Sequence, residues 1–522
     1  MTEKDSEWRP KGNPWAIAMT VTLAAFMEIL DTTIVNVSLR HIAGGMSVSY
    51  DNATWTMTSY LVANGIVLTL SGWLARTLGR RRYFLICLGM FTVASVACGL
   101  STNLAELVIF RTIQGFFGGG LQPTQQSILL DTFGAEQRTK AFGLTAVATV
   151  VSPAIGPALG GWITDNYGWP WIFFINIPIG ILALFGVAAL VEDPPSAKAQ
   201  GFHQVDGIGI AFISLGLGCL QVMLDRGEDE DWFGSGFIRA MGALAVFGLA
   251  GSVAWLLSAR RPVINLRVYA DRNFAMASVL MAAMAMILYG SIVLLPELAQ
   301  TVLGYTATLA GLILSPGAGL LILLIPVVIQ LQKVLRTKYV ISLGFFILAL
   351  SMFYSARVPP DVSFTELIIM RMVQAAGLAF LFAPLTSIAF VNIGKKDNGD
   401  ASALFTMCRN VTGSIGISLT TSQITERTQV HMAHLTPHLT PLDQGYGLQL
   451  QQLQNTLAGL GGRAGSAIGQ TSSYLLVTAH QTQAAVLAYS DLFVFAGVAA
   501  LCVLPFTFLL TGKAGGGADA KG

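Results

Sequence analysis

The sequence predicts an all-α polytopic membrane protein with fourteen transmembrane helices. Of its 522 residues, 53% are hydrophobic and only 11% are charged, whereas soluble domains contain about 25% charged residues. The hydrophobic residues form segments of about 20 residues or more, which is the length of helix that crosses a bilayer. Short polar loops separate the segments, and a helical bundle satisfies the backbone hydrogen bonds within lipid.

Hydropathy places the individual spans. The first apolar segment is too long for the core of a cleavable signal peptide, so we interpret it as a complete span. The predicted spans cover residues 16–39, 54–75, 83–101, 104–130, 139–164, 170–191, 206–224, 237–257, 274–300, 307–331, 338–356, 364–392, 401–425 and 490–511.

The distribution of basic residues predicts that both termini are cytoplasmic. With the N-terminus inside, 21 of the 30 Lys and Arg residues fall in cytoplasmic segments, five fall outside, and four lie within spans or at their edges. The acidic stretch 225–231 falls outside. This asymmetry follows the positive-inside rule.

A weak internal repeat divides the chain into two halves. An Arg-x-x-Gln element occurs in span four, at Arg111 and Gln114, and again in span twelve, at Arg371 and Gln374. Such parallel repeats are typical of transporters. The predicted parts are a cytoplasmic N-terminus (1–15), an N-terminal six-helix half (16–191), a linker with an inserted two-helix hairpin (192–272), a C-terminal six-helix half (273–511) and a disordered cytoplasmic tail (512–522).

One predicted outer loop, residues 426–489, is much longer than the others. A loop of this length in a compact protein is usually functional, which favours a cap or a docking surface. Within it, the segment from Tyr446 to Leu460 is predicted to form an amphipathic surface helix.

Two carboxylates lie inside the first span, at Glu28 and Asp31. Three positions apart on a helix, they share a face. Charges within a bilayer are costly, so they normally face the bundle interior and mark an ion or substrate pathway. The alternative is an acid that reaches water from a helix end, or one buried against a basic partner for assembly.

Arg111 in span four is the predicted partner of Asp31. Counting 1.5 Å per residue, both side chains lie about 10 Å below the outer surface. An ion pair would hold Asp31 ionised, whereas Glu28, nearer the bilayer centre, is suited to carry a proton because desolvation disfavours its charged form. In the alternative, backbone carbonyls alone hold Arg111 for packing.

Further polar and helix-weakening residues are candidates for the transport path. Those predicted to line a substrate cavity are Asn36, Gln114, Gln122, Glu297, Arg371, Gln374 and Arg409. Glu297 has the alternative of simply reaching the interface. Span five contains Pro153, Gly156, Pro157, Gly160 and Gly161, which weaken the helix or leave a smooth face. Such a helix can bend during gating, and static packing is the alternative.

The sequence predicts neither a cofactor nor a metal site. It has no phosphate-binding GxxxxGK[ST] motif for ATP, and its five cysteines form no CxxC pattern. A proton gradient is therefore the predicted energy source.

Several stretches together resemble the major facilitator superfamily, and within it the fourteen-helix drug:proton antiporters of the EmrB/QacA type. LDTTIVNVSL resembles the first-helix acidic motif, FRTIQG the fourth-helix basic motif and SPAIGPALGGWI the fifth-helix antiporter motif. GWLARTLGRRR resembles the signature between helices two and three, with Gly72, Gly79, Arg80 and Arg81 as gating candidates. This chain has Arg76 where that signature usually has Asp, so the family's gating salt bridge cannot be carried over.

The resemblance implies a proton-coupled exporter of hydrophobic or amphipathic toxic compounds in a bacterial inner membrane. It also implies a periplasmic adaptor and an outer-membrane channel as partners, with no nucleic acid. The alternatives are a dedicated exporter of one metabolite, such as a fatty acid or a siderophore, a proton-coupled importer, and a membrane-embedded enzyme. The span-five motif disfavours import, and no nucleophile–base arrangement supports an enzyme.

Overall fold

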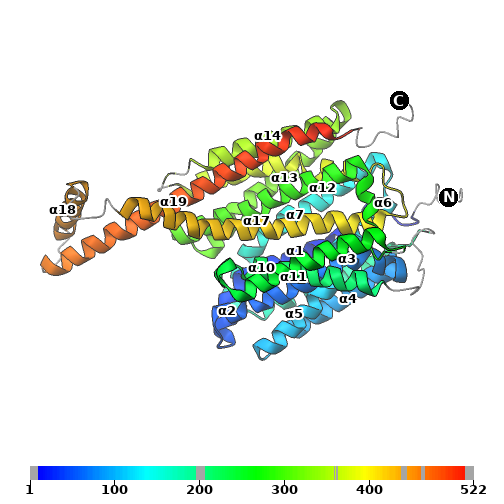
Figure 1. Ribbon diagram of the computed structural model, residues 1–522, viewed down its shortest axis with the longest axis horizontal. Coiled ribbons are helices and arrows are strands. Elements are labelled where there is room, and N and C mark those ends of the chain that lie inside the picture. The colour runs from blue at the N-terminus through cyan, green and yellow to red at the C-terminus, as the bar shows by residue number, and fades with distance from the viewer. Residues whose placement is uncertain are drawn as a thin grey trace.

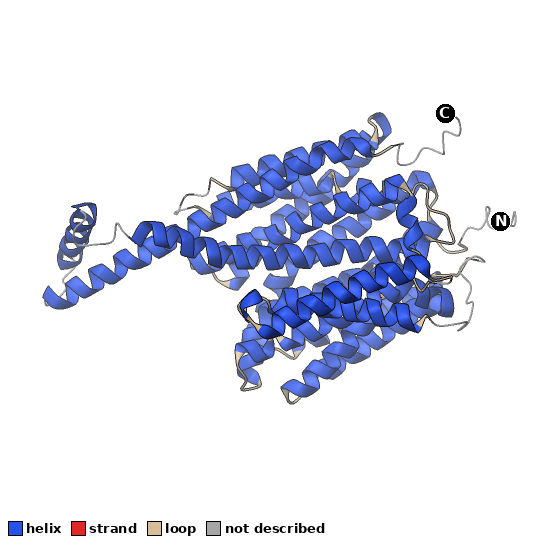
Figure 2. Ribbon diagram, viewed as in Figure 1, coloured by secondary structure: helices blue, strands red, loops and turns tan. Residues whose placement is uncertain are grey.

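The computed structural model describes residues 10–194, 206–260, 262–357, 359, 362–436, 444–459 and 465–511. All regular secondary structure in these ranges is helical (Figure 2). The predictions for residues 1–9, for the tail 512–522 and for parts of the linker and the long outer loop lie outside the described residues.

The helices follow the predicted order of two halves and a hairpin. The N-terminal half consists of α1 (Pro14–Gly45), α2 (Tyr50–Ala53), α3 (Trp55–Leu78), α4 (Arg80–Gly99), α5 (Leu104–Gly118), α6 (Leu121–Thr132), α7 (Ala135–Tyr167), α8 (Trp171–Phe174) and α9 (Asn176–Leu190). The hairpin consists of α10 (Gly207–Arg226) and α11 (Gly236–Ser258). The C-terminal half consists of α12 (Arg272–Glu297), α13 (Ala307–Val334), α14 (Thr337–Ser355), α15 (Phe364–Ala379), α16 (Phe382–Ala389), α17 (Asn398–Leu435), α18 (Gln444–Gly459) and α19 (Gly465–Val503).

The prediction of a helical membrane bundle is confirmed. Eleven helices among the described residues are long and apolar enough to cross a membrane, or twelve if α7, which is bent by 41°, counts as one span. The two remaining predicted spans coincide with α5–α6, which is interrupted, and with α17, which is comparatively polar. The count of fourteen therefore depends on these two.

Both termini lie at one end of the bundle, and α17 and α19 extend beyond it at the other end, where α18 also lies (Figure 1). We call these the termini end and the projection end. The prediction of a loop at 426–489 is wrong for most of its described residues, because α17 continues to Leu435 and α19 begins at Gly465. Hydropathy detects only the part of a helix that lies in lipid. The predicted surface helix is confirmed by α18.

The internal repeat is visible in where corresponding helices break. In both halves the Arg-x-x-Gln helix stops and restarts after two residues, between α5 and α6 and between α15 and α16. A glycine near each break lies close to the backbone of a neighbouring helix, but the neighbours differ. A Cβ on Gly115 would lie 2.3 Å from the Tyr60 carbonyl oxygen of α3, and one on Gly377 would lie 2.9 Å from the Leu348 nitrogen of α14. The helix break is thus the feature that the two halves share.

The hairpin contacts both halves rather than standing apart. Helix α10 packs against α3 of the N-terminal half and, more lightly, against α17 of the C-terminal half. The Ser418 hydroxyl donates to the Leu224 carbonyl at 2.9 Å. Within the hairpin, α10 and α11 approach closely through Gly216 and Gly248.

Candidate functional site

The predicted pair of Asp31 and Arg111 forms in the core of the N-terminal half. Both side chains are completely buried, and Arg111 Nη1 lies 2.6 Å from Asp31 Oδ2. Arg111 Nε also donates to the Thr56 carbonyl at 3.3 Å, and its guanidinium lies 4.1 Å from the centre of the Tyr60 ring. A buried charge is tolerated only when it is paired and hydrogen-bonded, and this pair satisfies that condition.

Two amide side chains complete the pair. Gln114 Nε2 donates to Asp31 Oδ1 at 3.0 Å, while its Oε1 accepts from Arg111 at 2.8 Å. Asn176 Nδ2 donates to the same Asp31 oxygen at 2.7 Å. Gln114 was a candidate for lining a substrate cavity, but the structure uses its polar atoms inside this network. The pair therefore ties α1, α5 and α9 together.

Glu28 lies in a second network, which meets the first at Tyr60. Its Oε1 accepts from the Tyr60 hydroxyl at 3.2 Å and from Asn64 Nδ2 at 3.0 Å, and its Oε2 accepts from Gln122 Nε2. The Oε1 atom of Gln122 in turn accepts from Arg409 Nη2. Glu28 is 4% exposed. Because Arg409 belongs to α17, this network crosses from the N-terminal to the C-terminal half.

A cavity of about 10 Å³ adjoins Gln122 and Arg409. This is the smallest volume that holds one water molecule. Its polar lining consists of Gln122, Gln125, Gln126, Thr145, Thr149, Thr406 and Arg409. This cavity between the two halves is therefore polar and small.

The two halves are joined by charges at the termini end. Arg76 of α3 forms an ion pair with Asp400 of α17, and its Nη2 donates to the Val263 carbonyl at 3.1 Å. Gly72 permits this contact, because a Cβ there would lie 2.7 Å from Asp400 Oδ1. The family's signature acid is absent from position 76, yet a cross-half ion pair exists with the basic residue on α3 and the acid on α17.

The other signature residues act within the N-terminal half. Gly79 has φ of 87°, a left-handed value that favours glycine, and it makes the turn between α3 and α4. Arg80 pairs with Asp131 of α6. Arg81 donates from its backbone nitrogen to Asp193 Oδ1 at 2.8 Å and from Nη2 to the Ala188 carbonyl at 2.6 Å.

The small residues of α7 face two neighbours. A Cβ on Gly156 would lie 2.1 Å from Thr33 Oγ1, and one on Gly160 would lie 3.1 Å from Ile34 Cγ2, so this stripe packs tightly on α1. Gly161 instead faces Thr308 of α13 in the other half. Pro153 and Pro157 lie inside the helix, and the bend falls beside Pro153. Tight packing and a bend therefore coexist in α7.

Four predicted cavity residues are not brought to Glu28. Arg371 is buried in the C-terminal half, where its Nη1 donates to Gln374 Oε1 at 3.3 Å. Gln374 Nε2 then donates to Ser355 Oγ at 3.2 Å. Glu297 is the last residue of α12, toward the projection end. Asn36 on α1 is exposed.

Sequence reasoning missed the uncharged and end-of-helix partners. Tyr60, Asn64 and Asn176 are single polar residues within apolar spans, and a buried polar group in such a place needs a partner. Asp131 and Asp400 lie at the termini end, beside Arg80 and Arg76 of the GWLARTLGRRR stretch. A search for acids at the same predicted depth would have found them.

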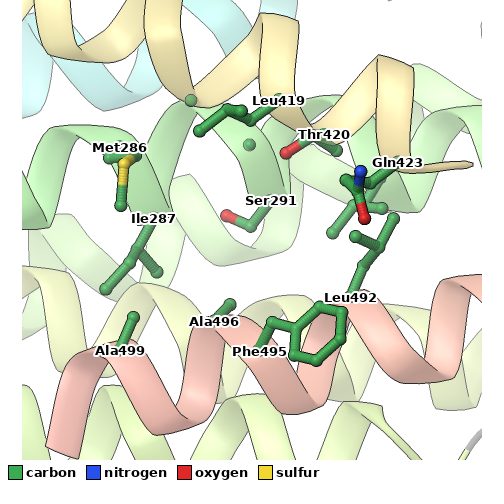
Figure 3. Close-up of a pocket in the computed structure, with 13 residues that line it drawn as sticks. Met286, Ile287, Ser291, Leu419, Thr420, Gln423, Leu492, Phe495, Ala496 and Ala499 are labelled. Atoms are coloured by element: carbon green, nitrogen blue, oxygen red, sulfur yellow. The ribbon is translucent and has the colours of Figure 1, made fainter. Parts of the chain in front are cut away.

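A larger hollow lies elsewhere, between α12, α17 and α19 (Figure 3). Its volume is about 280 Å³, and its lining is mostly apolar. Met286, Ile287, Leu419, Leu492 and Phe495 contribute to it, with Thr420 and Gln423 on one side. Leu419 and Phe495 are about half exposed, so this groove opens at the surface of the C-terminal half.

Comparison with known families agrees with this architecture. Residues 21–417 match the model of the Major Facilitator Superfamily. The chain belongs to that superfamily. It is a multi-pass membrane protein of a transporter family, rather than a member of an enzyme family.

Named relatives place it in the EmrB-like branch of the superfamily. It is 36% identical over 464 residues to the multidrug export protein EmrB of Haemophilus influenzae, covering 88% of each chain. It is 32% identical over 493 residues to the fatty acid resistance protein FarB of Neisseria gonorrhoeae, covering 94% of this chain and 95% of the relative. A crystal structure of a mutant peptide transporter POT aligns with TM-score 0.58 at 16% identity, covering 98% of this chain and 99% of that chain, which supports the fold alone.

The first prediction concerns the buried pair. Replacing Asp31 by Asn leaves the Arg111 charge buried without an anion, which costs about 3–5 kcal/mol of the free energy of unfolding. The measurement is unfolding of the detergent-solubilised protein. Asp165→Asn is the control, since its side chain is 60% exposed and the expected change is within about 0.5 kcal/mol. Equal stabilities of the two variants would contradict the assigned role of the pair.

Proposed function

We propose that this chain is a proton-coupled antiporter that exports hydrophobic or amphipathic toxic compounds by alternating access. The observation that carries the proposal is the carboxylate of Glu28, buried in the membrane domain and hydrogen-bonded in a network that spans both halves. The proteins named as multidrug exporters and as a colistin resistance protein among its relatives support the same function. No cofactor takes part, and the proton gradient supplies the energy.

The two carboxylates have different roles in this mechanism. Asp31 is saturated by Arg111, Gln114 and Asn176, so it anchors the N-terminal half and does not exchange its proton during turnover. Glu28 is held only by neutral donors. It therefore accepts a proton at lower cost than Asp31, and it is the acid that exchanges protons against substrate.

The termini end is the cytoplasmic end in this proposal, because the basic clusters occur in the loops there. The membrane is the inner membrane of a bacterium. The ion pair of Arg76 and Asp400 and the packing of Gly72 on Gly399 close this end. We therefore infer that the conformation is closed toward the cytoplasm, and that export requires these contacts to break and reform.

The projection end is then periplasmic, and we propose it as the docking element for a periplasmic adaptor that leads to an outer-membrane channel. Helices α17 and α19 extend beyond the bundle here (Figure 1). The projection exposes apolar side chains, among them Val430, Leu448 and Tyr474, and Tyr474 is 71% exposed. Exposed apolar surface in water is typical of an interaction site.

A dedicated exporter of one metabolite, such as a fatty acid or a siderophore, is the second candidate. Similarity to FarB, a fatty acid resistance protein, favours a fatty acid. The apolar groove between α12, α17 and α19 is consistent with an alkyl chain, because its few polar groups lie on one side (Figure 3). A substrate panel that includes lipophilic dyes and long-chain fatty acids separates the two candidates.

The second prediction concerns proton coupling. Inverted vesicles with an acidic interior should accumulate a lipophilic dye, and dissipation of the gradient should abolish the accumulation. Glu28→Gln should lower accumulation to background, because the amide carries no exchangeable proton. Glu106→Gln, at a partly exposed acid in the first turn of α5, is the matched control and should retain transport. Full gradient-driven transport in Glu28→Gln places the coupling elsewhere, and transport of fatty acids alone favours the second candidate.

The third prediction concerns the projection. A photo-crosslinker at Tyr474 or Leu448 should give adducts with a co-expressed periplasmic adaptor in intact cells, whereas one at Lys140, exposed near the start of α7, should not. The reason is that only the projection faces the periplasm. Adducts from Lys140 and none from Tyr474 would refute both the proposed sidedness and the docking role.

A further inference from the structure

The orientation of the Gln122 amide follows from its two neighbours. A guanidinium has only donors, and an ionised carboxylate has only acceptors. The Oε1 atom of Gln122 therefore faces Arg409, and its Nε2 faces Glu28 Oε2. This arrangement requires that Glu28 Oε2 carry no proton, because Oε2 then presents lone pairs to the amide N–H.

The Gln122 amide oxygen is one of the few acceptors available to the Arg409 guanidinium. Its Nη2 donates to Gln122, its Nε donates to Asn410 Oδ1 at 3.2 Å, and its guanidinium lies 5.7 Å from the centre of the Phe382 ring. Among the described residues, no carboxylate forms an ion pair with Arg409. The side chain is 6% exposed, so loss of the amide oxygen leaves a nearly buried cation with a poorer set of acceptors.

The contact between Gln122 and Arg409 is the first of a series along α6 and α17. Toward the termini end, Thr406 Oγ1 donates to Gln126 Oε1 at 3.1 Å. Further along, Asn398 Nδ2 donates to Asp131 Oδ1 at 3.3 Å. We call this series of polar contacts the α6–α17 seam. It joins the two halves from the level of Glu28 to the termini end.

Protonation of Glu28 on Oε2 replaces an acceptor by an O–H donor. Two donors then face each other, and the amide must rotate so that its oxygen accepts from Glu28. The rotation turns Nε2 toward the Arg409 guanidinium, again donor against donor, and the bond across the halves is lost.

We propose that Gln122 is a positioning residue that transmits the protonation state of Glu28 to Arg409 and thereby opens or closes the α6–α17 seam. This inference rests on the proposed antiport function. The ionised acid keeps the seam closed at the cytoplasmic end, and the protonated acid releases it, so a proton bound from outside is discharged inside.

Few other titratable or charged groups face Glu28, so the pH response is assigned to its carboxylate. The titratable or charged ones are Tyr60 from α3, Arg409 from α17, Tyr289 from α12 and the Asp31–Arg111 pair. The titratable residues of α7 lie only near its two ends, and α9 has none. The competing arrangement places the proton on Oε1, where the Tyr60 hydroxyl accepts it and the amide keeps its orientation.

The fourth prediction tests the relay with spin labels at Lys140 of the N-terminal half and Lys396 of the C-terminal half, both exposed near the termini end. The distance between the labels in the full chain is measured against pH. In the wild type it should be short at high pH and lengthen at low pH. Gln122→Leu should give a distance that no longer responds to pH. Arg409→Gln should also give a distance that does not respond to pH.

The matched control is Gln125→Leu. Gln125 lies on the same helix but donates only to Thr22 at 3.1 Å and to Thr145 at 2.8 Å, both within the N-terminal half. This variant should keep the wild-type pH response, and Arg409→Lys, which retains a donor, should keep part of it. These two variants separate loss of the relay from a general defect of folding.

A pH response of Gln122→Leu equal to that of the wild type would overturn the relay and favour the proton on Oε1. An unresponsive wild type overturns it as well. The antiport proposal fails by a different result, namely absence of gradient-driven dye accumulation in wild-type vesicles. Transport in the wild type together with an unchanged pH response in Gln122→Leu would refute the relay alone.

Discussion

The cost of placing a charge inside the membrane shapes this molecule. Asp31 and Arg111 pair with each other, and Gln114 and Asn176 donate to the second oxygen of the carboxylate, while Arg111 Nη2 has no hydrogen-bond partner among the described residues. These contacts hold α1, α5 and α9 together around the ion pair. Glu28, one helical turn away, has only neutral donors and connects through Gln122 to the other half. In the proposed mechanism Asp31 is therefore structural and Glu28 changes its charge.

The two halves share several structural features but differ in the charged residues placed on them. The Arg-x-x-Gln element, the helix break and the close glycine contact occur in both. Among the described residues, a carboxylate lies beside the arginine of the N-terminal copy only. Arg371 is buried with Gln374 as a neutral partner. In the proposed mechanism this asymmetry concentrates the coupling chemistry in the N-terminal half, because proton exchange needs an acid, while Arg409 and Asp400 of α17 are the contacts in the other half that respond.

Much of this could be predicted from the sequence, because a bilayer imposes strong and simple constraints. The helix lengths and the matched depth of Asp31 and Arg111 follow from hydropathy and a rise of 1.5 Å per residue. The repeat of span four in span twelve follows from the Arg-x-x-Gln element. The role of Gln122 could not be predicted, since it depends on which helix face meets Arg409. Asp400 as the partner of Arg76 needed the tertiary arrangement as well. The long extensions of α17 and α19 escaped prediction because their outer parts are polar.

The central claim is that Glu28 is the acid that exchanges protons against substrate. The most direct test is to count protons released when a transported lipophilic dye binds to the purified protein in weakly buffered detergent solution. The account predicts that the wild type releases protons on binding, that Asp165→Asn does the same, and that Glu28→Gln binds dye without release. Proton release from Glu28→Gln equal to that of the wild type would contradict it.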